Sequence, residues 1–385
     1  MNTTNLPVEM TEHFLHEQIA APVIIADIEV LHNRDADRYF VRATSKDGAV
    51  GVATTNHRSS YLYPLMTRRI IPYCIGKDAR DLPALLEGVY RHDSNYKLVG
   101  LPFWNSIANV EFALWDLLGQ ITGRSVGEML GGAVRREIPI YLSSLRRDTT
   151  PEQEVAWLQK RLAETGTSAV KVKIGGRMSG NADAMPGRSE NLLTLARATF
   201  GEDIAIYVDA NGSYDSAAAI EVGKMLEGHG VGWFEEPCPW EEYDETKRVA
   251  DALGIPVAGG EQDSSLPRWR EMIENLGVDI VQPDPSYNGG FLRTLRVARM
   301  AEAAGLPVAP HSPKSDATAA YLLHTASLLH LPAPHMEFHG AAVVDPQSWF
   351  IPNFPIQKGS IAVPSGPGLG VAVAPEVLAH AERLA

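Results

Sequence analysis

Cysteine is scarce in this chain, which has only Cys74 and Cys238 among its 385 residues. Two cysteines cannot build a disulfide framework, so a packed core must hold the fold together. A chain of this length can bury such a core and is long enough for two domains. The low cysteine content also leads us to expect a reducing compartment.

Positive charge and long apolar runs are also scarce. Lysine and arginine number 34 against 47 acidic residues, which gives a formal charge of −13. This balance argues against a nucleic-acid partner, because binding to phosphates requires a basic face. No stretch approaches the roughly 20 apolar residues of a membrane span, and residues 1–18 lack the basic start and apolar core of a secretory signal. We therefore expect a cytoplasmic protein with no membrane and no nucleic-acid partner.

The first third of the chain mixes strands and helices. Asp47-Gly48 predicts a tight turn, and apolar residues at three- and four-residue steps predict a helix over 106–121 that stops at Gly123. Runs typical of an antiparallel meander occupy residues 23–31, 38–44 and 49–54. This part of the sequence therefore predicts an α+β domain.

After about residue 138 the pattern changes to strand–helix units. A Gly-x-Gly-x-x-Gly sequence after the first strand, the signature of a dinucleotide fold, is absent. Short β-branched runs alternate with amphipathic segments at 151–165, 189–200, 215–228 and 290–304. Such repetition over roughly 200 residues favours a (β/α)8 barrel. We predict an α+β domain over 1–137, the barrel over 138–349, and a C-terminal segment over 350–385 that packs back on the first domain.

Charged or ionisable residues end most of the predicted barrel strands, where a buried strand should stay apolar. Because the carboxyl ends of barrel strands meet at one rim, where barrel active sites lie, we expect these side chains to converge. A single acid after a strand is often a helix cap, but regular spacing of 23–27 residues over most of the series favours a functional site. The residues are Lys173, Asp209, Glu235, Glu261, Asp284, His311 and Glu337.

Three of these residues predict a metal site. Asp209, Glu235 and Glu261 follow three successive strands, and carboxylates so close together repel unless a cation lies between them. An all-oxygen set without cysteine or histidine favours Mg²⁺ over Zn²⁺.

The other strand ends predict acid–base groups. Lys171 and Lys173 are two apart on one strand, so both face the barrel interior, and we expect neighbouring ammonium groups beside a metal to lower each other's pKa. Asp284 and His311 end consecutive strands, where the aspartate can fix the tautomer of the histidine.

With these residues the chain resembles the enolase superfamily, and within it the mandelate racemase subgroup. The resemblance covers nearly the whole length. It is carried by Glu111-Phe112-Ala113-Leu114-Trp115-Asp116, Leu130-Gly131-Gly132, Lys171-Val172-Lys173, Asp209-Ala210-Asn211, Glu235-Glu236-Pro237, Gly260-Glu261, Asp284, His311 and Glu337. It implies a barrel with an α+β capping domain, completed by the C-terminal segment.

The resemblance also implies a role for each site residue. Asp209, Glu235 and Glu261 would bind Mg²⁺. Lys173 and His311 would be acid–base groups on opposite faces of the substrate, with Asp284 as the partner of His311. Lys171 and Glu337 would contact the substrate carboxylate and its enediolate form, and Asn211 would reach substrate oxygens beside the metal.

The sequence departs from the family pattern at two places that face the substrate. The turn His32–Asp37 is short where relatives often carry a long closing loop, and Gly175–Arg188 is a long insertion near the rim. We expect residues 1–20 or the loop 55–63 to replace the lid. In that loop, His57, Arg58 and Tyr61 would touch the distal end of the substrate.

These features predict Mg²⁺-dependent removal of the proton α to a carboxylate, with dehydration of a sugar acid to a 2-keto-3-deoxy acid as the favoured outcome. A racemase, epimerase or cycloisomerase would use the same first step. A non-catalytic sensor that kept the fold is a third reading, which two opposed bases argue against. We expect a small-molecule carboxylate as substrate and a homo-oligomer as the assembly.

Overall fold

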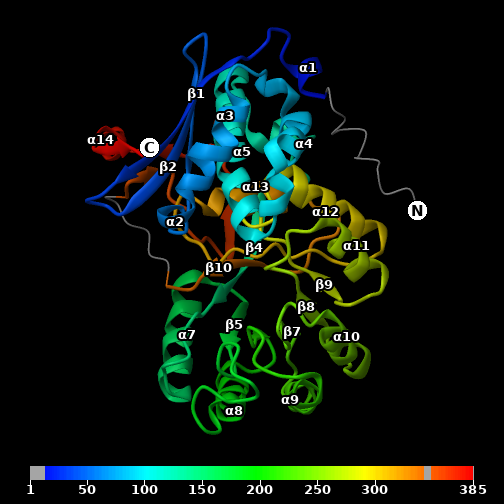
Figure 1. Ribbon diagram of the computed structural model, residues 1–385. Helices are drawn as coiled ribbons and strands as arrows, with labels where there is room; N and C mark the ends of the chain where they lie inside the picture. Colours follow the sequence, from blue (N-terminus) through cyan, green and yellow to red (C-terminus); the bar gives the residue numbers. More distant parts are fainter. Residues whose placement is uncertain (1–13, 342–347, 385) are drawn as a thin grey trace.

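The computed structural model describes residues 14–341 and 348–384. An α+β domain lies above a barrel in the view of Figure 1. The chain first builds the upper domain, then the barrel, and its last strand returns to the upper domain. Within the described residues, no helix has the length and apolar character needed to cross a bilayer.

The capping domain contains the predicted antiparallel meander. Its strands are β1 (Ile25–Asn33), β2 (Arg38–Ser45) and β3 (Val50–Thr54). Gly48 has a φ of 85° in the turn before β3, which glycine adopts without strain. The predicted long helix is α5 (Leu101–Thr122); it starts before residue 106, with Pro102 in its first turn, and ends at the left-handed Gly123. A Cβ at Gly51 would lie 2.2 Å from the backbone nitrogen of Leu117, so α5 packs directly on β3.

Shorter helices complete this domain, and one of them corrects the sequence analysis. The segment 55–63, expected as a loop, becomes helical from Ser59 onward, even though Pro64 lies inside the helix. A π-helical turn over Met66–Ile70 follows directly. The helices are α1 (Phe14–Gln18), α2 (Ser59–Leu65), α3 (Ile71–Cys74), α4 (Leu82–Arg91) and α6 (Val126–Met129).

The barrel strands run parallel, in the order β10-β4-β5-β6-β7-β8-β9. The seventh predicted strand is reduced to bridges from Val308 to Val281 and Pro332. Pro307 and Pro310 flank it, and because proline donates no backbone hydrogen bond, a longer ladder cannot form. The strands are β4 (Glu137–Ser143), β5 (Ala169–Lys173), β6 (Ala205–Asp209), β7 (Trp233–Glu235), β8 (Val257–Gly259), β9 (Ile280–Val281) and β10 (Met336–His339).

Helices surround this sheet (Figure 1) and bury its outward-facing residues. The four amphipathic segments expected in the barrel are helical within one residue of their predicted limits. Thr150 begins α7 with a capping box, and Asp215 caps α9. The helices are α7 (Pro151–Thr165), α8 (Arg188–Phe200), α9 (Ser216–Gly228), α10 (Tyr243–Ala252), α11 (Leu266–Glu274), α12 (Phe291–Ala303) and α13 (Ala319–Ser327).

The C-terminal segment contacts both units. Its strand β12 (Ser360–Ala362) pairs antiparallel with β4, and β14 (Ala381–Arg383) pairs with β1 in the capping sheet. Between them lie β13 (Ala372–Val373), which pairs with β11 (Phe350–Ile351), and α14 (Pro375–Ala379). The domain limits at 137 and 349 stay a prediction.

Candidate active site

The polar strand ends meet at the carboxyl rim of the barrel. Lys173, Asp209 and Glu235 are the last residues of β5, β6 and β7, and they are direct neighbours in the register of the parallel sheet. Glu261 lies two residues beyond β8. The alternation of a strand explains why Lys171 shares the inner face with Lys173, whereas Val170 and Val172 pack among the apolar residues of the core.

Three carboxylates form a compact buried cluster. Asp209, Glu235 and Glu261 each offer an oxygen, and these oxygens lie within 4.8 Å of one another. Burial raises the pKa of Glu235 to about 7, even though Lys171 beside it lowers the pKa. Burial also raises the pKa of Asp209, but Lys173 and Lys171 outweigh it and leave this pKa below its ordinary value.

This cluster fits a hard divalent cation. Oε2 of Glu261 is buried and accepts no hydrogen bond from the described residues, although Nε2 of His311 lies 3.1 Å away. An oxygen-only donor set that leaves a buried carboxylate oxygen without a hydrogen bond suits Mg²⁺. Asp209, Glu235 and Glu261 are therefore the residues that would hold it.

Lys171 lies between carboxylates on three strands. Its Nζ is 2.5 Å from Glu235, 2.9 Å from Glu337 and 3.8 Å from Asp209. Burial lowers the pKa of Lys171, but Glu235 and Glu337 outweigh it and leave the pKa well above its ordinary value. The predicted lowering is therefore wrong for Lys171, because its nearest charges are carboxylates rather than the second ammonium group.

His311 and Asp284 lie together as predicted from their places on consecutive strands. Nδ1 of His311 is 2.8 Å from Oδ2 of Asp284, and the backbone of Ser286 donates to Oδ1 of Asp284 at 2.6 Å. Burial lowers the pKa of His311, but the carboxylates of Glu261, Glu337 and Asp284 raise it by more than burial lowers it, and the pKa is about 9. In the metal-free protein these carboxylates favour the protonated imidazole, which can donate a proton.

Glu337 connects the two sides of the site. Ser143 donates to its Oε1 at 2.8 Å, and the backbone of Ser312 donates to its Oε2 at 3.0 Å. Burial raises its pKa, but Lys171 and His311 lower it to about 2. Glu337 is therefore an anion that orders Lys171 and His311 around the same space.

Sequence reasoning missed two residues that contact carboxylates of the site. Gln282 donates to Oε2 of Glu235 at 2.9 Å. Its signal was present, because it is a polar residue that directly follows the buried strand β9, two positions before Asp284. Ser143, at the end of β4, had no signal beyond its place on a barrel strand.

The amide of Asn211 is fully engaged with the protein. Its Nδ2 donates to Asp209 at 3.2 Å and to Glu236 at 3.4 Å. Its Oδ1 accepts hydrogen bonds from Arg147 at 2.9 Å and from Arg177 at 3.3 Å. The predicted contact of Asn211 with substrate therefore stays a prediction, while the two arginines, which sequence reasoning passed over, lie at the same rim.

The predicted lid residues lie unequally close to the site. Nη1 of Arg58 donates to the hydroxyl of Tyr287 at 2.7 Å, and the guanidinium stacks 4.7 Å from that ring. The Tyr287 ring lies 5.9 Å from the His311 ring. Burial lowers the pKa of His57, and Arg58 lowers it further. Tyr61 is 62% exposed, and the structure gives it no contact with the carboxylates.

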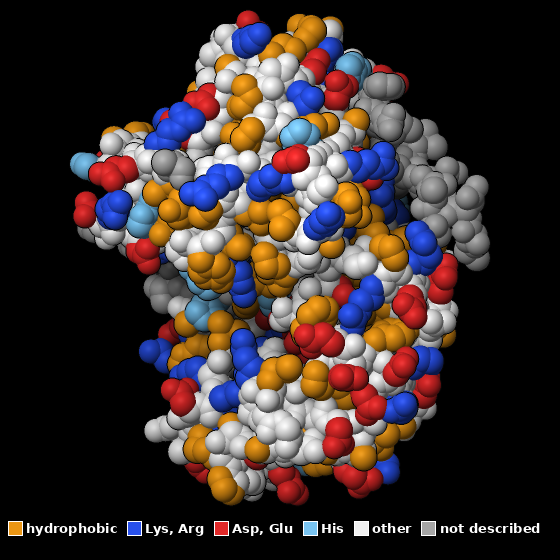
Figure 2. All heavy atoms as spheres, in the orientation of Figure 1, with side chains coloured by type: hydrophobic (Ala, Val, Ile, Leu, Met, Phe, Trp, Pro, Cys, Tyr) orange, Lys and Arg blue, Asp and Glu red, His pale blue; other side chains and the backbone are white. Residues whose placement is uncertain are grey.

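The other segments expected to shape the lid are placed as follows. Of residues 1–20, residues 1–13 lie outside the described part of the chain, and α1 packs at the far end of the capping domain from the barrel (Figure 1). The Gly175–Arg188 insertion lies on the rim, where the Met178 backbone donates to Asn211 at 3.1 Å. Figure 2 shows a hollow between the capping domain and the barrel where Lys, Arg and His side chains gather.

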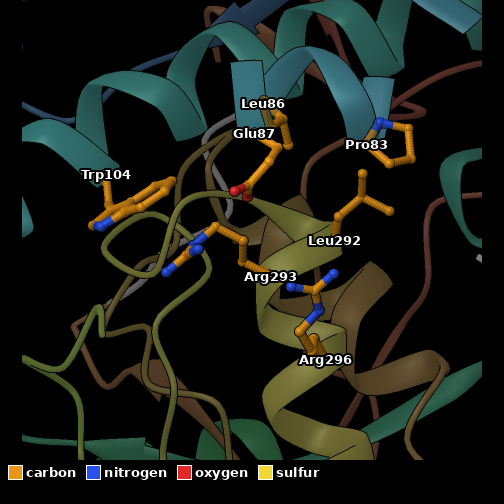
Figure 3. Close-up of a pocket in the computed structure, with 7 residues that line it drawn as sticks. All are labelled: Pro83, Leu86, Glu87, Trp104, Leu292, Arg293 and Arg296. Carbon is orange, nitrogen blue, oxygen red and sulfur yellow. The ribbon is translucent and has the colours of Figure 1, made fainter. Parts of the chain in front are cut away.

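Two further pockets lie between the capping domain and the barrel. The larger is lined by Trp104, Trp240 and Arg268 among others, and the smaller, between α4 and α12, is shown in Figure 3. In the smaller pocket the carboxylate of Glu87 points toward Arg293, with Arg296 one turn further along α12. None of the predicted site residues lines either pocket.

Known proteins are similar to this chain in sequence and in fold. The family model described as "Enolase C-terminal domain-like" matches residues 153–377. The arabinonate dehydratase of Saccharolobus solfataricus is 30% identical over 309 residues, which cover 78% of each chain. The D-galactarolactone cycloisomerase of Agrobacterium fabrum is 30% identical, with 78% of this chain and 80% of the relative covered.

A solved structure agrees over most of the chain. The mandelate racemase/muconate lactonizing protein from Paracoccus denitrificans, complexed with magnesium, is 28% identical with a TM-score of 0.85, and the match covers 94% of this chain and 98% of that one. The barrel and its capping domain are therefore those of a known class of enzymes. The chain belongs to the enolase superfamily, in its mandelate racemase subgroup.

Proposed function

We propose that this enzyme removes the proton α to a carboxylate with the help of Mg²⁺, and that it dehydrates a sugar acid to a 2-keto-3-deoxy acid. The observation that supports this most is the placement of two proton-transfer groups around one carboxylate cluster. Lys173 contacts Asp209, and His311 lies 3.1 Å from Glu261. Lys173 at the end of β5 and His311, which follows Val308, approach this cluster from different sides of the barrel.

The reaction needs charge stabilisation, because an α-proton of a carboxylate is only weakly acidic. When bound, Mg²⁺ supplies positive charge for the enediolate that forms. Lys171 is an ammonium group at neutral pH and is buried, so it can donate hydrogen bonds to the substrate carboxylate from a fixed position. Glu337 and Glu235 hold that ammonium group in place.

Proton transfer is assigned to Lys173 and His311. Lys173 is the proposed base that takes the α-proton. His311, held by Asp284, is the proposed acid that protonates the departing β-hydroxyl. The product enol then tautomerises to the ketone, which makes the step effectively irreversible.

The named relatives support this reaction class and leave a second candidate. One relative is named a dehydratase and another a cycloisomerase. A cycloisomerase, racemase or epimerase would start with the same proton removal, and the two opposed groups would serve a racemase equally well. We favour dehydration because His311, held by Asp284, can supply the proton that a departing hydroxyl needs.

A screen of acid sugars with Mg²⁺ tests the proposal. Each acid is incubated in D₂O, and the products are followed by NMR and by a keto-acid assay. A 2-keto-3-deoxy product supports dehydration. Recovery of the C2 epimer with deuterium at C2 and no keto acid would overturn dehydration in favour of epimerisation. Conversion of a cyclic acid sugar, such as a lactone, to a keto acid of the same composition, with no loss of water, would favour the cycloisomerase.

A further inference from the structure

Arg147 and Arg177 converge on one neutral atom at the rim of the barrel. Arg147 follows β4 and Arg177 follows β5, and Nη2 of each donates to Oδ1 of Asn211, at 2.9 Å and 3.3 Å. Nδ2 of the same amide donates to Asp209 at 3.2 Å. The two guanidinium groups therefore lie one side chain away from the carboxylate cluster, beside the strand that carries Lys173.

Neither guanidinium group has a carboxylate partner among residues 14–341 and 348–384. Besides Asn211, Arg147 donates only to backbone carbonyls, those of Gly175 and Asp209. The preceding residue is a contrast, because Nη2 of Arg146 lies 3.0 Å from Glu154. Two cations that share one neutral acceptor repel each other, and partial burial of Arg147 weakens its hydration. An anion bound between them would remove both costs.

A third arginine near the rim, Arg58, also lacks a carboxylate partner among the described residues. Arg58 donates to the neutral hydroxyl of Tyr287 and forms no ion pair within the described part of the chain. Arg147 and Arg177 share one acceptor even though the formal charge of the whole protein is −13. Figure 2 shows positive side chains gathered in the hollow above the barrel. Such a concave positive surface attracts anions.

We propose that Arg147 and Arg177 bind a second carboxylate at the distal end of the substrate, so that the preferred substrates are dicarboxylic sugar acids. The inference rests on the proposed function, in which the reacting carboxylate is bound at Lys171 and the cluster. A planar carboxylate matches the paired N–H groups of guanidinium. A terminal hydroxymethyl group carries no charge and would leave both cations unpaired.

Matched pairs of substrates test the proposal. Keto-acid formation with Mg²⁺ is compared for aldonic acids and for the aldaric acids of the same configuration, with aldonic acid 6-phosphates as a third set. The proteins are the wild type, Arg147→Gln, Arg177→Gln and Arg147→Lys. We expect the wild type to prefer diacids, and each glutamine variant to lose about 10–100-fold in kcat/KM for diacids, mainly through KM, because a charge-assisted hydrogen bond is removed. The values for monoacids should change less than about threefold, and Arg147→Lys should restore part of the diacid activity.

The matched control is Arg296→Gln on α12. Arg296 is also a half-buried arginine without an ion pair in the described chain, but it lies in the smaller pocket (Figure 3). Arg296→Gln should leave kcat/KM unchanged for both diacids and monoacids. A wild type that prefers monoacids, or an equal loss for both classes in Arg147→Gln, would overturn the proposal, and so would a preference for the phosphates.

A second experiment, which measures binding alone, tests this proposal separately from the proposed function. Calorimetry measures binding of adipate, a dicarboxylate that has no hydroxyl to lose, against hexanoate, to the Mg²⁺-loaded protein. Stronger binding of adipate that is lost in Arg147→Gln supports the second carboxylate site even if no acid sugar is converted. If acid sugars give keto acids but adipate binds no better than hexanoate, the proposed function stands and this inference is wrong.

Discussion

Glu111 on α5 accepts a hydrogen bond at 2.6 Å from the backbone N–H of Phe291, the first residue of α12 and 180 positions away. The next N–H, of Leu292, donates to the other oxygen of the same carboxylate at 3.0 Å. A Cβ at Gly290 would lie 1.8 Å from Oε2 of Glu111, so residue 290 must be glycine for this contact. The capping domain is thereby attached to the barrel helix that follows the strand of Asp284.

Loss of this cap should destabilise the fold. Burial raises the pKa of Glu111 to about 7, while the N–H groups of Leu292 and Phe291 lower it. Glu111→Gln places an amide donor against a backbone donor, and we expect the free energy of unfolding to fall by about 2 kcal/mol. Urea denaturation measures the change, with the exposed Glu221→Gln as control. An unchanged midpoint in Glu111→Gln would show that the cap contributes no stability.

Metal binding should depend on the charge of Glu235. Glu235→Gln keeps the shape of the side chain and removes one of the three anionic ligands. Changes to residues that only support metal ligands typically lower metal affinity by about 10–100-fold, and we expect a larger loss of Mg²⁺ affinity here. Keto-acid formation should then be lost, while circular dichroism stays that of the wild type. Calorimetry measures the affinity, and Glu236→Gln, which changes the adjacent buried carboxyl outside the cluster, is the matched control. Undiminished Mg²⁺ affinity in Glu235→Gln would remove it from the ligand set.

The metal-free protein should lose stability as pH rises through about 9. The pKa of His311 is raised from 6.5 to about 9 in the folded state, so the folded protein binds this proton more tightly than the unfolded chain does. The resulting stability, about 3 kcal/mol, is fully present below pH 6.5 and is lost as pH rises to 9. Thermal denaturation between pH 6 and 10 should show this slope in the wild type with EDTA, and His311→Gln should show less of it. Parallel profiles for the two proteins would contradict the raised pKa.

Arg58 should affect substrate binding more than turnover. Its guanidinium reaches the rim through Tyr287, next to His311. Arg58→Ala removes a charged donor, so we expect KM for a six-carbon acid sugar to rise about tenfold, with kcat within about threefold. Tyr61→Phe, a change at an exposed residue, provides the comparison. Unchanged kinetics for variants of Arg58, His57 and Tyr61 alike would reject a role for this segment in the lid.

The sequence predicts the barrel and its rim well because both depend on local patterns. Strand–helix alternation fixes the fold class, and the spacing of polar strand ends brings Asp209, Glu235 and Glu261 together. Contacts between distant parts of the chain leave no such local pattern. No local pattern identifies Glu111 and Phe291 as partners, because they are 180 positions apart. The apolar residues around Val308 predict a longer strand, but the neighbouring prolines shorten it.

Electrostatics was harder to predict than position. Two lysines on one strand face predicted a lowered pKa, but the structure surrounds Lys171 with Glu235 and Glu337 and raises its pKa instead. Arg147 stands next to a predicted strand end, yet only its shared acceptor and missing carboxylate partner among the described residues distinguish it from Arg146. Such charges depend on neighbours from several strands, which a linear pattern does not specify.

Variants of Lys173 and His311 should separate the two proton transfers. If Lys173 is the base, His311→Asn can still exchange the C2 proton of the substrate for deuterium in D₂O, but it lacks the acid for the departing hydroxyl. We expect C2 exchange to persist in this variant while keto-acid formation falls by about 10²–10⁴-fold, the usual contribution of general acid catalysis. Lys173→Met should lose both exchange and product. NMR of recovered substrate measures exchange, with Mg²⁺ affinity checked by calorimetry in each variant so that a lost metal is not mistaken for a lost base. Exchange that disappears in His311→Asn but persists in Lys173→Met would reverse the two roles, because it would make His311 the residue that removes the α-proton.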